Sequence, residues 1–386
     1  MKHKLQILVC RSVSGKFTSQ HRGDGLSLFF ILPILALLWG TVSNAASSQP
    51  LMITGVSLDK QTFDPSKGEY ITLTIAINQK ADVNVKIYDR LSNEVRLYAK
   101  SIRDTGKCEV TWDGRQKNGK LAAGNLFLYV IEATNPAGEK VVYNQAPQTG
   151  GLKVKPLEYT FDKKTGRITY VLPKACMVRL RVGLKDGMLI QTLFDWQPQT
   201  AGRHSLVWDG KDASGLMNLR EHPELELNLT CYRVPANTIM TTGNIIALAK
   251  PKTKNTNLSL DLWSTTNKYL HYTHDPFHCH EPKFTVSFPL ATKEDGNETP
   301  MVTNTTPIRV VLDPRDARYI ISKRFEVMLF VDGTYFFEME EATSPFTFNW
   351  NTKGFKPGLH TVTVNVMSYD DHIGVVSQPV IIGEQK

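Results

Sequence analysis

One tripeptide occurs twice in similar surroundings, and it constrains the fold more than any other feature of the chain. The motifs Trp112-Asp113-Gly114 and Trp208-Asp209-Gly210 lie 96 residues apart. In each copy one Gly stands six residues before the Trp, and another stands five residues after the Gly of the motif. An internal repeat of this length corresponds to one β-sandwich domain and is too long for one turn of a solenoid. We therefore expect consecutive sandwiches.

Apolar and polar side chains alternate in the segments before each copy of the motif. The alternation covers residues 71–77 and 83–88 in the first repeat and residues 168–172 and 178–182 in the second. A period of two residues predicts strands with one buried face. Arg179 and Arg181 occupy the positions between the apolar residues, so we expect both to point outward. The predicted fold class is all-β, with tandem immunoglobulin-like β-sandwiches.

The C-terminal part of the chain has a third β-rich pattern. Alternation at residues 325–331 leads into Asp332-Gly333, a hairpin signal, and alternation returns at residues 362–366. We do not expect a close third copy of the Trp-Asp-Gly motif there. The predicted organisation is a signal peptide at 1–45, sandwiches at 51–147, 154–247 and 307–386, and a linker with a His-rich loop at 248–306.

Turn chemistry accounts for each residue of the repeated motif. A Trp at a strand end can cover a sandwich core with a large apolar area. Asp followed by Gly starts a tight turn, because the carboxylate accepts hydrogen bonds from nearby backbone N–H groups and Gly adopts positive φ. The alternative is that Asp113 or Asp209 is catalytic or binds a metal. We interpret both motifs as structural.

This pattern resembles the immunoglobulin-like domain of bacterial flagellar hook-capping proteins of the FlgD type. Val83-Asn84-Val85-Lys86-Ile87-Tyr88-Asp89 and residues 106–119 carry the resemblance, and residues 178–182 and 202–215 carry it more loosely. It covers about residues 54–240. The resemblance implies a sandwich fold in a module of secreted bacterial proteins, and it implies no activity. The predicted signal peptide argues against a role in hook assembly.

The first 45 residues have the pattern of an export signal. Basic residues precede an apolar run at 26–39, and Ser43 and Ala45 occupy the −3 and −1 positions of a cleavage site. The run contains Pro33 and is shorter than the roughly 20 residues of a membrane span. We expect the signal to be cleaved. The alternative is an uncleaved anchor, which would be the only contact of the chain with a membrane. The predicted location is the periplasm, the cell surface or the extracellular space.

Charge and cysteine content limit the partners and the covalent structure. Without the five basic residues and one acidic residue of 1–45, the formal charge of +8 falls to +4. This is too mild to predict a nucleic-acid partner. Export implies an oxidising compartment, and Cys176 and Cys231 lie in one repeat, where a disulfide could join them. The alternative is that some cysteines stay as small buried hydrophobic residues. The sequence does not decide among the three pairings of Cys108, Cys176, Cys231 and Cys279.

Residues 271–280 contain four of the ten His residues of the chain. Imidazole is a common ligand of Zn and Cu, and a thiolate adds a soft ligand. In an extended segment the even-numbered His residues share one face. The alternative is a solvated loop with Cys279 in a disulfide. The candidate ligands of Cu or Zn are His274, His278 and His280, with His271, Asp275 or Cys279 as a fourth.

Motifs of common enzyme classes are absent from the sequence. It contains no Gly-x-Ser-x-Gly, His-Glu-x-x-His, phosphate-loop or dinucleotide-loop pattern. We therefore predict an exported, non-enzymatic scaffold or adhesion element that binds other envelope or surface proteins through sheet edges or loops. One alternative is a Cu- or Zn-binding accessory protein that uses residues 271–280. Another is an accessory module of a secreted hydrolase.

Overall fold

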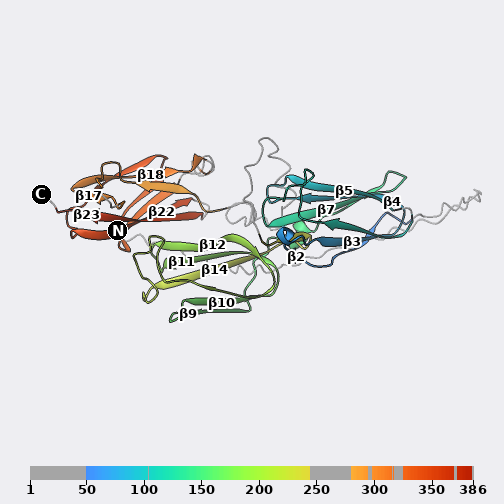
Figure 1. Ribbon diagram of the computed structural model, residues 1–386, viewed down its shortest axis with the longest axis horizontal. Coiled ribbons are helices and arrows are strands. Elements are labelled where there is room, and N and C mark those ends of the chain that lie inside the picture. The colour runs from blue at the N-terminus through green and yellow to red at the C-terminus, as the bar shows by residue number, and fades with distance from the viewer. Residues whose placement is uncertain are drawn as a thin grey trace, which may run out of the picture.

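The computed structural model describes residues 49–102, 104–243, 280–293, 298–314, 316, 325–368 and 372–384. Within these ranges the regular secondary structure is almost entirely β-strand and forms three sandwiches, so the predicted fold class is confirmed (Figure 1). The α-helix α1 (Ala146–Thr149) is short. None of the helices in these ranges has the length and apolar character needed to cross a membrane. The predicted signal peptide lies outside the described residues.

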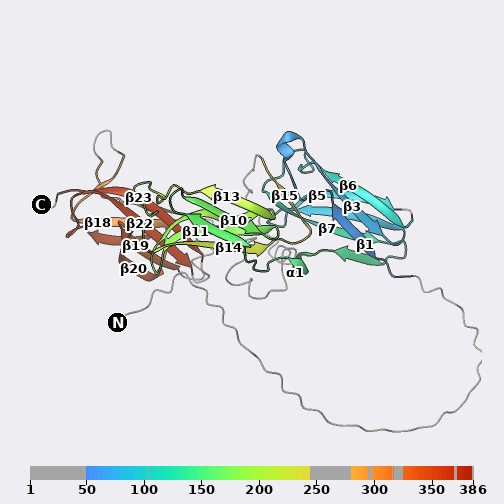
Figure 2. The same ribbon diagram turned by 90° about the horizontal axis from the view of Figure 1, so that it is seen from below.

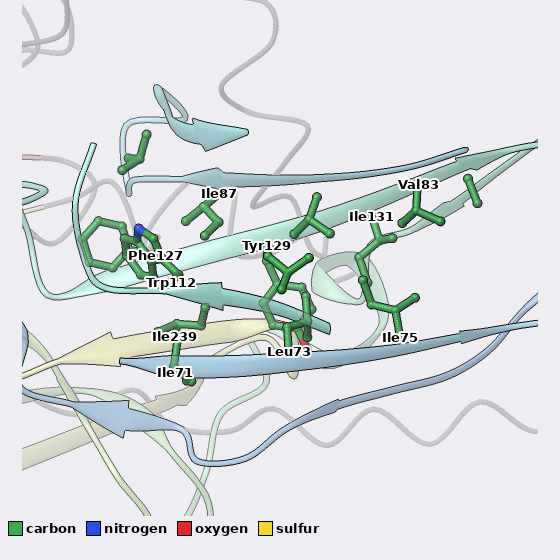
Figure 3. Packing of buried hydrophobic residues seen from close by; sticks show 14 of the residues in the cluster. Ile71, Leu73, Ile75, Val83, Ile87, Trp112, Phe127, Tyr129, Ile131 and Ile239 are labelled. Carbon is green, nitrogen blue, oxygen red and sulfur yellow. The ribbon is translucent and has the colours of Figure 1, made fainter. Parts of the chain in front are cut away.

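The first sandwich has two sheets with the strand orders β1-β3-β6 and β2-β15-β7-β4-β5, and β8 also pairs with β7. Alternate residues of the central strands point into the core, where Trp112 and Phe127 lie against each other (Figure 3). The strands are β1 (Ile53–Leu58), β2 (Thr62–Phe63), β3 (Ile71–Ile77), β4 (Ala81–Tyr88), β5 (Glu94–Ile102), β6 (Gly106–Trp112), β7 (Leu126–Thr134), β8 (Lys140–Tyr143) and β15 (Thr238–Thr241).

The second sandwich has the strand orders β13-β10-β9 and β12-β11-β14. Every residue of its central strand β11 is buried, because one face covers the sandwich core and the other contacts neighbouring parts of the chain. The strands are β9 (Glu158–Asp162), β10 (Arg167–Leu172), β11 (Cys176–Leu184), β12 (Leu189–Gln199), β13 (Gly202–Val207) and β14 (Leu225–Arg233).

The third sandwich has the strand orders β16-β18-β21 and β17-β23-β22-β19-β20. Strand β16 lies inside the stretch that the sequence indicated as linker, yet it pairs with β18 over four residues. A strand this short between turn residues carries too little alternation to be separated from a loop. The strands are β16 (Phe284–Ser287), β17 (Met301–Val302), β18 (Thr305–Leu312), β19 (Phe325–Val331), β20 (Thr334–Ala342), β21 (Phe346–Asn351), β22 (Gly358–Ser368) and β23 (Ile373–Ile382).

The three sandwiches share one topology. The sheets β1-β3-β6, β9-β10-β13 and β16-β18-β21 correspond strand by strand in chain order. The facing sheets contain the corresponding triplets β5-β4-β7, β12-β11-β14 and β20-β19-β22. The third sandwich is therefore a structural repeat of the first two, although its sequence lacks the Trp-Asp-Gly motif.

Strand β15 follows the second sandwich in the chain but belongs to the first. It pairs antiparallel with β7 and parallel with β2. Just before it, the buried Asn237 side chain donates hydrogen bonds to the Tyr129 carbonyl at 2.7 Å and to Asn144 Oδ1 at 3.0 Å. In the third sandwich β23 has the same place, antiparallel to β22 and parallel to β17. The second sandwich is thus inserted between strands β8 and β15 of the first, an arrangement that the repeat pattern did not predict.

Candidate functional site at the junctions between sandwiches

The first Trp-Asp-Gly motif forms a closed turn. The Trp112 side chain is buried, and its Nε1 donates to the Arg115 carbonyl at 3.0 Å. The exposed Asp113 carboxylate accepts a hydrogen bond from the Arg115 backbone N–H at 3.1 Å. Gly114 has φ of +77°, which favours glycine, and a Cβ there would lie 2.5 Å from the Pro65 side chain.

The second motif repeats these interactions. Trp208 Nε1 donates to the Lys211 carbonyl at 3.0 Å, and the Asp209 carboxylate accepts from the Lys211 N–H at 2.9 Å. Gly210 has φ of +85°. In both copies the Asp carboxylate accepts a hydrogen bond from the backbone of its own turn, so the geometry fits the structural interpretation of the motif.

The third sandwich makes a related turn from a different sequence. Trp350 is buried at the end of β21, and Asn351 Oδ1 accepts a hydrogen bond from the Lys353 N–H at 2.9 Å. An Asn side chain offers the same acceptor oxygen as Asp, so the turn survives the replacement. The pattern Trp-Asx-x-Lys/Arg would have found all three turns from the sequence.

Only the last of the predicted metal-site residues, His280, belongs to the described part of the chain; His271, His274, His278, Asp275 and Cys279 lie outside it. His280 Nε2 lies 2.7 Å from Asp316 Oδ1, and this hydrogen bond raises the pKa of the imidazole. The described residues contain no group of three His, Cys, Asp or Glu that could hold a metal ion. The metal site stays a prediction.

Glu281, the residue after His280, contacts the outer face of the second sandwich. The Glu281 carboxylate accepts hydrogen bonds from Arg181 Nε at 3.2 Å and from the Thr192 hydroxyl. The Glu281 backbone N–H donates to Asp195 Oδ2 at 2.9 Å. Burial raises the pKa of Glu281, and the adjacent Arg181 acts in the opposite direction. This buried ion pair attaches the start of the third sandwich to strands β11 and β12.

Arg179 and Arg181 point away from the core of their own sandwich, as expected, but they do not face solvent. Their exposed fractions are 7% and 8%. The Arg179 guanidinium lies 4.6 Å from the centre of the Trp196 ring, and burial lowers its pKa to about 9. Arg181 Nη2 donates to the Ile373 carbonyl of the third sandwich at 3.1 Å. Polar residues on an outward face can therefore be contacts to another domain, which alternation within one strand cannot reveal.

The second and third sandwiches pack directly against each other. The buried Asn365 amide donates to the Leu189 carbonyl at 3.0 Å and accepts from the Leu189 N–H at 2.8 Å. Met328, Phe330 and Ile373 of the third sandwich belong to the apolar cluster of the second. A two-way amide contact at the centre of an apolar interface fixes the relative position of the two sheets.

A separate apolar cluster joins the first and second sandwiches. Leu126, Leu128 and Val130 on the outer face of β7 contact the second sandwich, and Trp196 lies at the centre of the contact. The Trp196 backbone has φ of +49°, and the pairing of β11 with β12 is irregular beside it. Figure 2 shows the resulting row, with the second sandwich between the other two. The residues at both junctions contact residues of the neighbouring sandwich. Their role in this arrangement is to hold the sandwiches together.

The described cysteines are free thiols. Cys176 and Cys231 lie on the adjacent strands β11 and β14, and burial raises the pKa of each to about 12. Both belong to the apolar cluster of the second sandwich, so of the two alternatives that the sequence left open, the structure has the small buried hydrophobic residues and no disulfide between them. Cys108 is free and half-buried.

Comparison with known proteins identifies the first sandwich. Residues 61–137 match the FlgD Ig-like domain family, which confirms the resemblance seen in the first repeat. The match covers one part of the chain and defines a class of domain rather than an activity. No curated protein matches the chain.

The chain also has distant matches among solved structures. A bacterial ice-binding adhesin, studied for host cell surface retention, is 12% identical with a TM-score of 0.19, over 88% of this chain and 99% of that one. A tandem repeat from the extending region of a large adhesion protein is 13% identical with a TM-score of 0.20, over 86% and 74%. Alpha-2-macroglobulin of E. coli is 9% identical with a TM-score of 0.20, over 87% and 23%. At such TM-scores these matches carry no argument about function.

Proposed function

We propose that this protein is an exported, non-enzymatic structural protein that acts as a scaffold or adhesion element of the cell envelope or cell surface. The observation that carries the proposal is the joining of three sandwiches into one body. Strand β15 returns to the first sandwich, and the Glu281–Arg181 pair and Asn365 attach the third to the second. Such a body holds surfaces at fixed distances from one another.

The partners in this proposal are other envelope or surface proteins. Strands β5 and β20 are edge strands at corresponding places in the first and third sandwiches, and they expose the apolar side chains of Leu97 and Met339. Open strand edges bind extended segments of partners through backbone hydrogen bonds. The mild net charge argues against nucleic acid as a partner.

Localisation and cross-linking together test this proposal. The untagged full-length chain is expressed and the cells are fractionated, with a chain that lacks residues 1–45 as the control. We expect the full-length chain in the envelope or outside the cell, and the control in the cytosol. A photo-reactive residue in place of Leu97 or Met339 should then cross-link a defined envelope protein, whereas one in place of the buried Ile75 should not. Recovery of the full-length chain from the cytosol contradicts the proposal.

Metal binding is the second candidate function, and the geometry of His280 favours it. Its Nε2 is held by Asp316, so the remaining nitrogen, Nδ1, is the one available to a metal. A carboxylate that orients an imidazole in this way is common around metal ligands. Residues 46–386 without an affinity tag would be tested for bound Cu and Zn by mass spectrometry. About one metal per chain, lost in the His274→Ala, His278→Ala, His280→Ala variant, supports this function; no bound metal in either protein refutes it.

A further inference from the structure

Strands β5, β12 and β20 have the same place in their sandwiches, at the end of a sheet. In the second sandwich, β12 lies against β23 of the third. No described strand pairs with the outer edge of β5 or of β20, and each of these two strands is nine residues long. The first and third sandwiches are the two ends of the row (Figure 2). Each end of the row therefore has one such open strand edge.

The edge of β5 is positively charged. Arg96 and Lys100 are on this strand, and its one acidic residue, Glu94, stands beyond a register shift in the pairing with β4. Lys100 is exposed. Burial raises the pKa of Cys108 on the facing strand β6, and the charge of Lys100 opposes this rise. Leu97, between the two cations, has an exposed fraction of 48%.

The edge of β20 is negatively charged. Glu338, Glu340 and Glu341 are on this strand, which contains no Lys or Arg. Burial raises the pKa of Glu326 on the neighbouring strand β19, and the charges of Glu338 and Glu340 raise it further. A carboxylate beside this edge therefore meets a negative potential, and a cation is attracted to it.

Charge decides which of these edges can meet. Opposite charges on paired strands are favourable, and like charges directly opposite each other are unfavourable. Two β5 edges would bring cations together, and two β20 edges would bring carboxylates together. We propose that β5 of one copy of this chain binds β20 of a second copy, so that copies associate head to tail. This inference rests on the proposed function, which assigns partner binding to these edges, and it identifies the partner.

The two edges fit together as neighbouring strands of one sheet. Because β5 and β20 have equivalent places, antiparallel pairing keeps both cores on the same side of the joined sheet. The contact also covers Leu97 and Met339. Register shifts on both sides of Phe337–Met339 keep the regular part of the β20 edge short. The backbone contact is therefore small, and we expect a dissociation constant on the order of 100 µM, with charge supplying the specificity.

A head-to-tail contact does not end at two copies. The interface is heterologous, because it joins two different surfaces, and each bound pair retains one open β5 and one open β20. Further copies add at these edges and produce a filament or a ring. Such an array places the three-sandwich bodies at regular intervals, which suits a scaffold.

Sedimentation of the purified mature chain tests the proposal. Between about 10 and 500 µM, the average mass should rise beyond that of a dimer, because the ends of each assembly stay open. Raising the salt concentration to about 0.5 M should weaken the association, because the charges are then screened. A chain that stays monomeric over this range, or an association that is independent of salt, overturns the proposal.

Charge reversal identifies the two edges. Lys100→Glu places a carboxylate opposite the acidic edge, and Glu338→Lys places a cation opposite the basic edge. Each variant alone should associate at least about tenfold more weakly than the unmodified chain. An equal mixture of the two variants should regain association, because each then meets an edge of opposite charge. Recovery in the mixture also shows that both variants are folded.

A matched variant controls for the change in net charge. Lys117→Glu makes the same change at an exposed turn of the first sandwich, away from the edge of β5, and it should associate as the unmodified chain does. Loss of association in this control, or a mixture of the two edge variants that fails to regain it, overturns the proposal.

Cross-linking locates the contact. Carbodiimide coupling of isotope-labelled with unlabelled chains should join a Lys of β5 in one chain to a Glu of β20 in the other. Coupling between chains at other surfaces alone overturns the proposal. These experiments use purified chain, so self-association and the envelope location of the proposed function succeed or fail separately.

Discussion

Replacing Trp196 with Ala should destabilise the first and second sandwiches together. The side chain is 2% exposed and lies in the apolar cluster between them, beside Leu128 and Tyr232. Its ring also covers the guanidinium of Arg179 at 4.6 Å. The substitution therefore removes a shared apolar contact and leaves a buried cation without its aromatic partner.

The expected size of the effect follows from the burial. Truncating a fully buried Trp to Ala typically lowers the free energy of unfolding by about 3–5 kcal/mol. Loss of a desolvated cation–π contact adds up to about 2 kcal/mol, part of which the truncation value already includes. We expect a total of about 4 kcal/mol, and Trp196→Phe should recover part of it.

Urea unfolding followed separately in the two sandwiches provides the measurement. Hydrogen exchange coupled to mass spectrometry would report on β7 of the first sandwich and β11 of the second in the same experiment. Both should lose protection in the Trp196→Ala variant, whereas Leu157→Ala, at a side chain that is 70% exposed, should change stability by less than about 0.5 kcal/mol. A change of less than about 1 kcal/mol for Trp196→Ala, or a change confined to the second sandwich, would refute the reasoning.

Three further predictions concern other contacts. Asn365→Ala should lower the free energy of unfolding by about 3 kcal/mol in urea titration, because it leaves the Leu189 N–H and carbonyl unpaired in a buried interface; a loss below about 0.5 kcal/mol would contradict this. Asp113→Ala should cost only about 1 kcal/mol in thermal unfolding, because it removes one exposed turn hydrogen bond, and a loss above about 3 kcal/mol would indicate a role beyond the turn. Burial raises the folded-state pKa of Cys176 and Cys231 to about 12 from an ordinary value near 9, so their stabilising contribution is complete below pH 9 and is lost as the pH rises toward 12. The loss should be about 1.4 kcal/mol per pH unit for each thiol, and Cys176→Ala should reduce this slope in denaturant titrations between pH 9 and 11; an unchanged slope would contradict the assignment.

The residues of single strands and turns predicted much of the fold. Alternation at 71–77 and 178–182 indicated the central strands correctly, and the Trp-Asp-Gly turns have the hydrogen bonds that their chemistry implies. These features depend on neighbours in sequence, which a local pattern contains. The turn at Trp350 was missed because Asn and Thr replace Asp and Gly there.

Local sequence patterns could not predict the contacts between sandwiches. Strand β15 has four residues, and nothing in them indicates that they pair with β7, more than a hundred residues earlier. The burial of Arg181 depends on Glu281, which comes from a different domain. Long-range strand pairing and domain packing depend on complementary surfaces of different domains. They are therefore visible only in the three-dimensional structure.

The central claim, that the three sandwiches form one rigid body, is tested most directly by a distance measurement between the two ends. Spin labels on Asn118→Cys in the first sandwich and Lys353→Cys in the third, in the Cys108→Ser and Cys279→Ser background, would be measured by pulsed electron paramagnetic resonance. Both positions are exposed turns. A single narrow distance distribution that broadens with Trp196→Ala or Asn365→Ala is the predicted result. A broad distribution in the unmodified background would show that the sandwiches move independently and would contradict the claim.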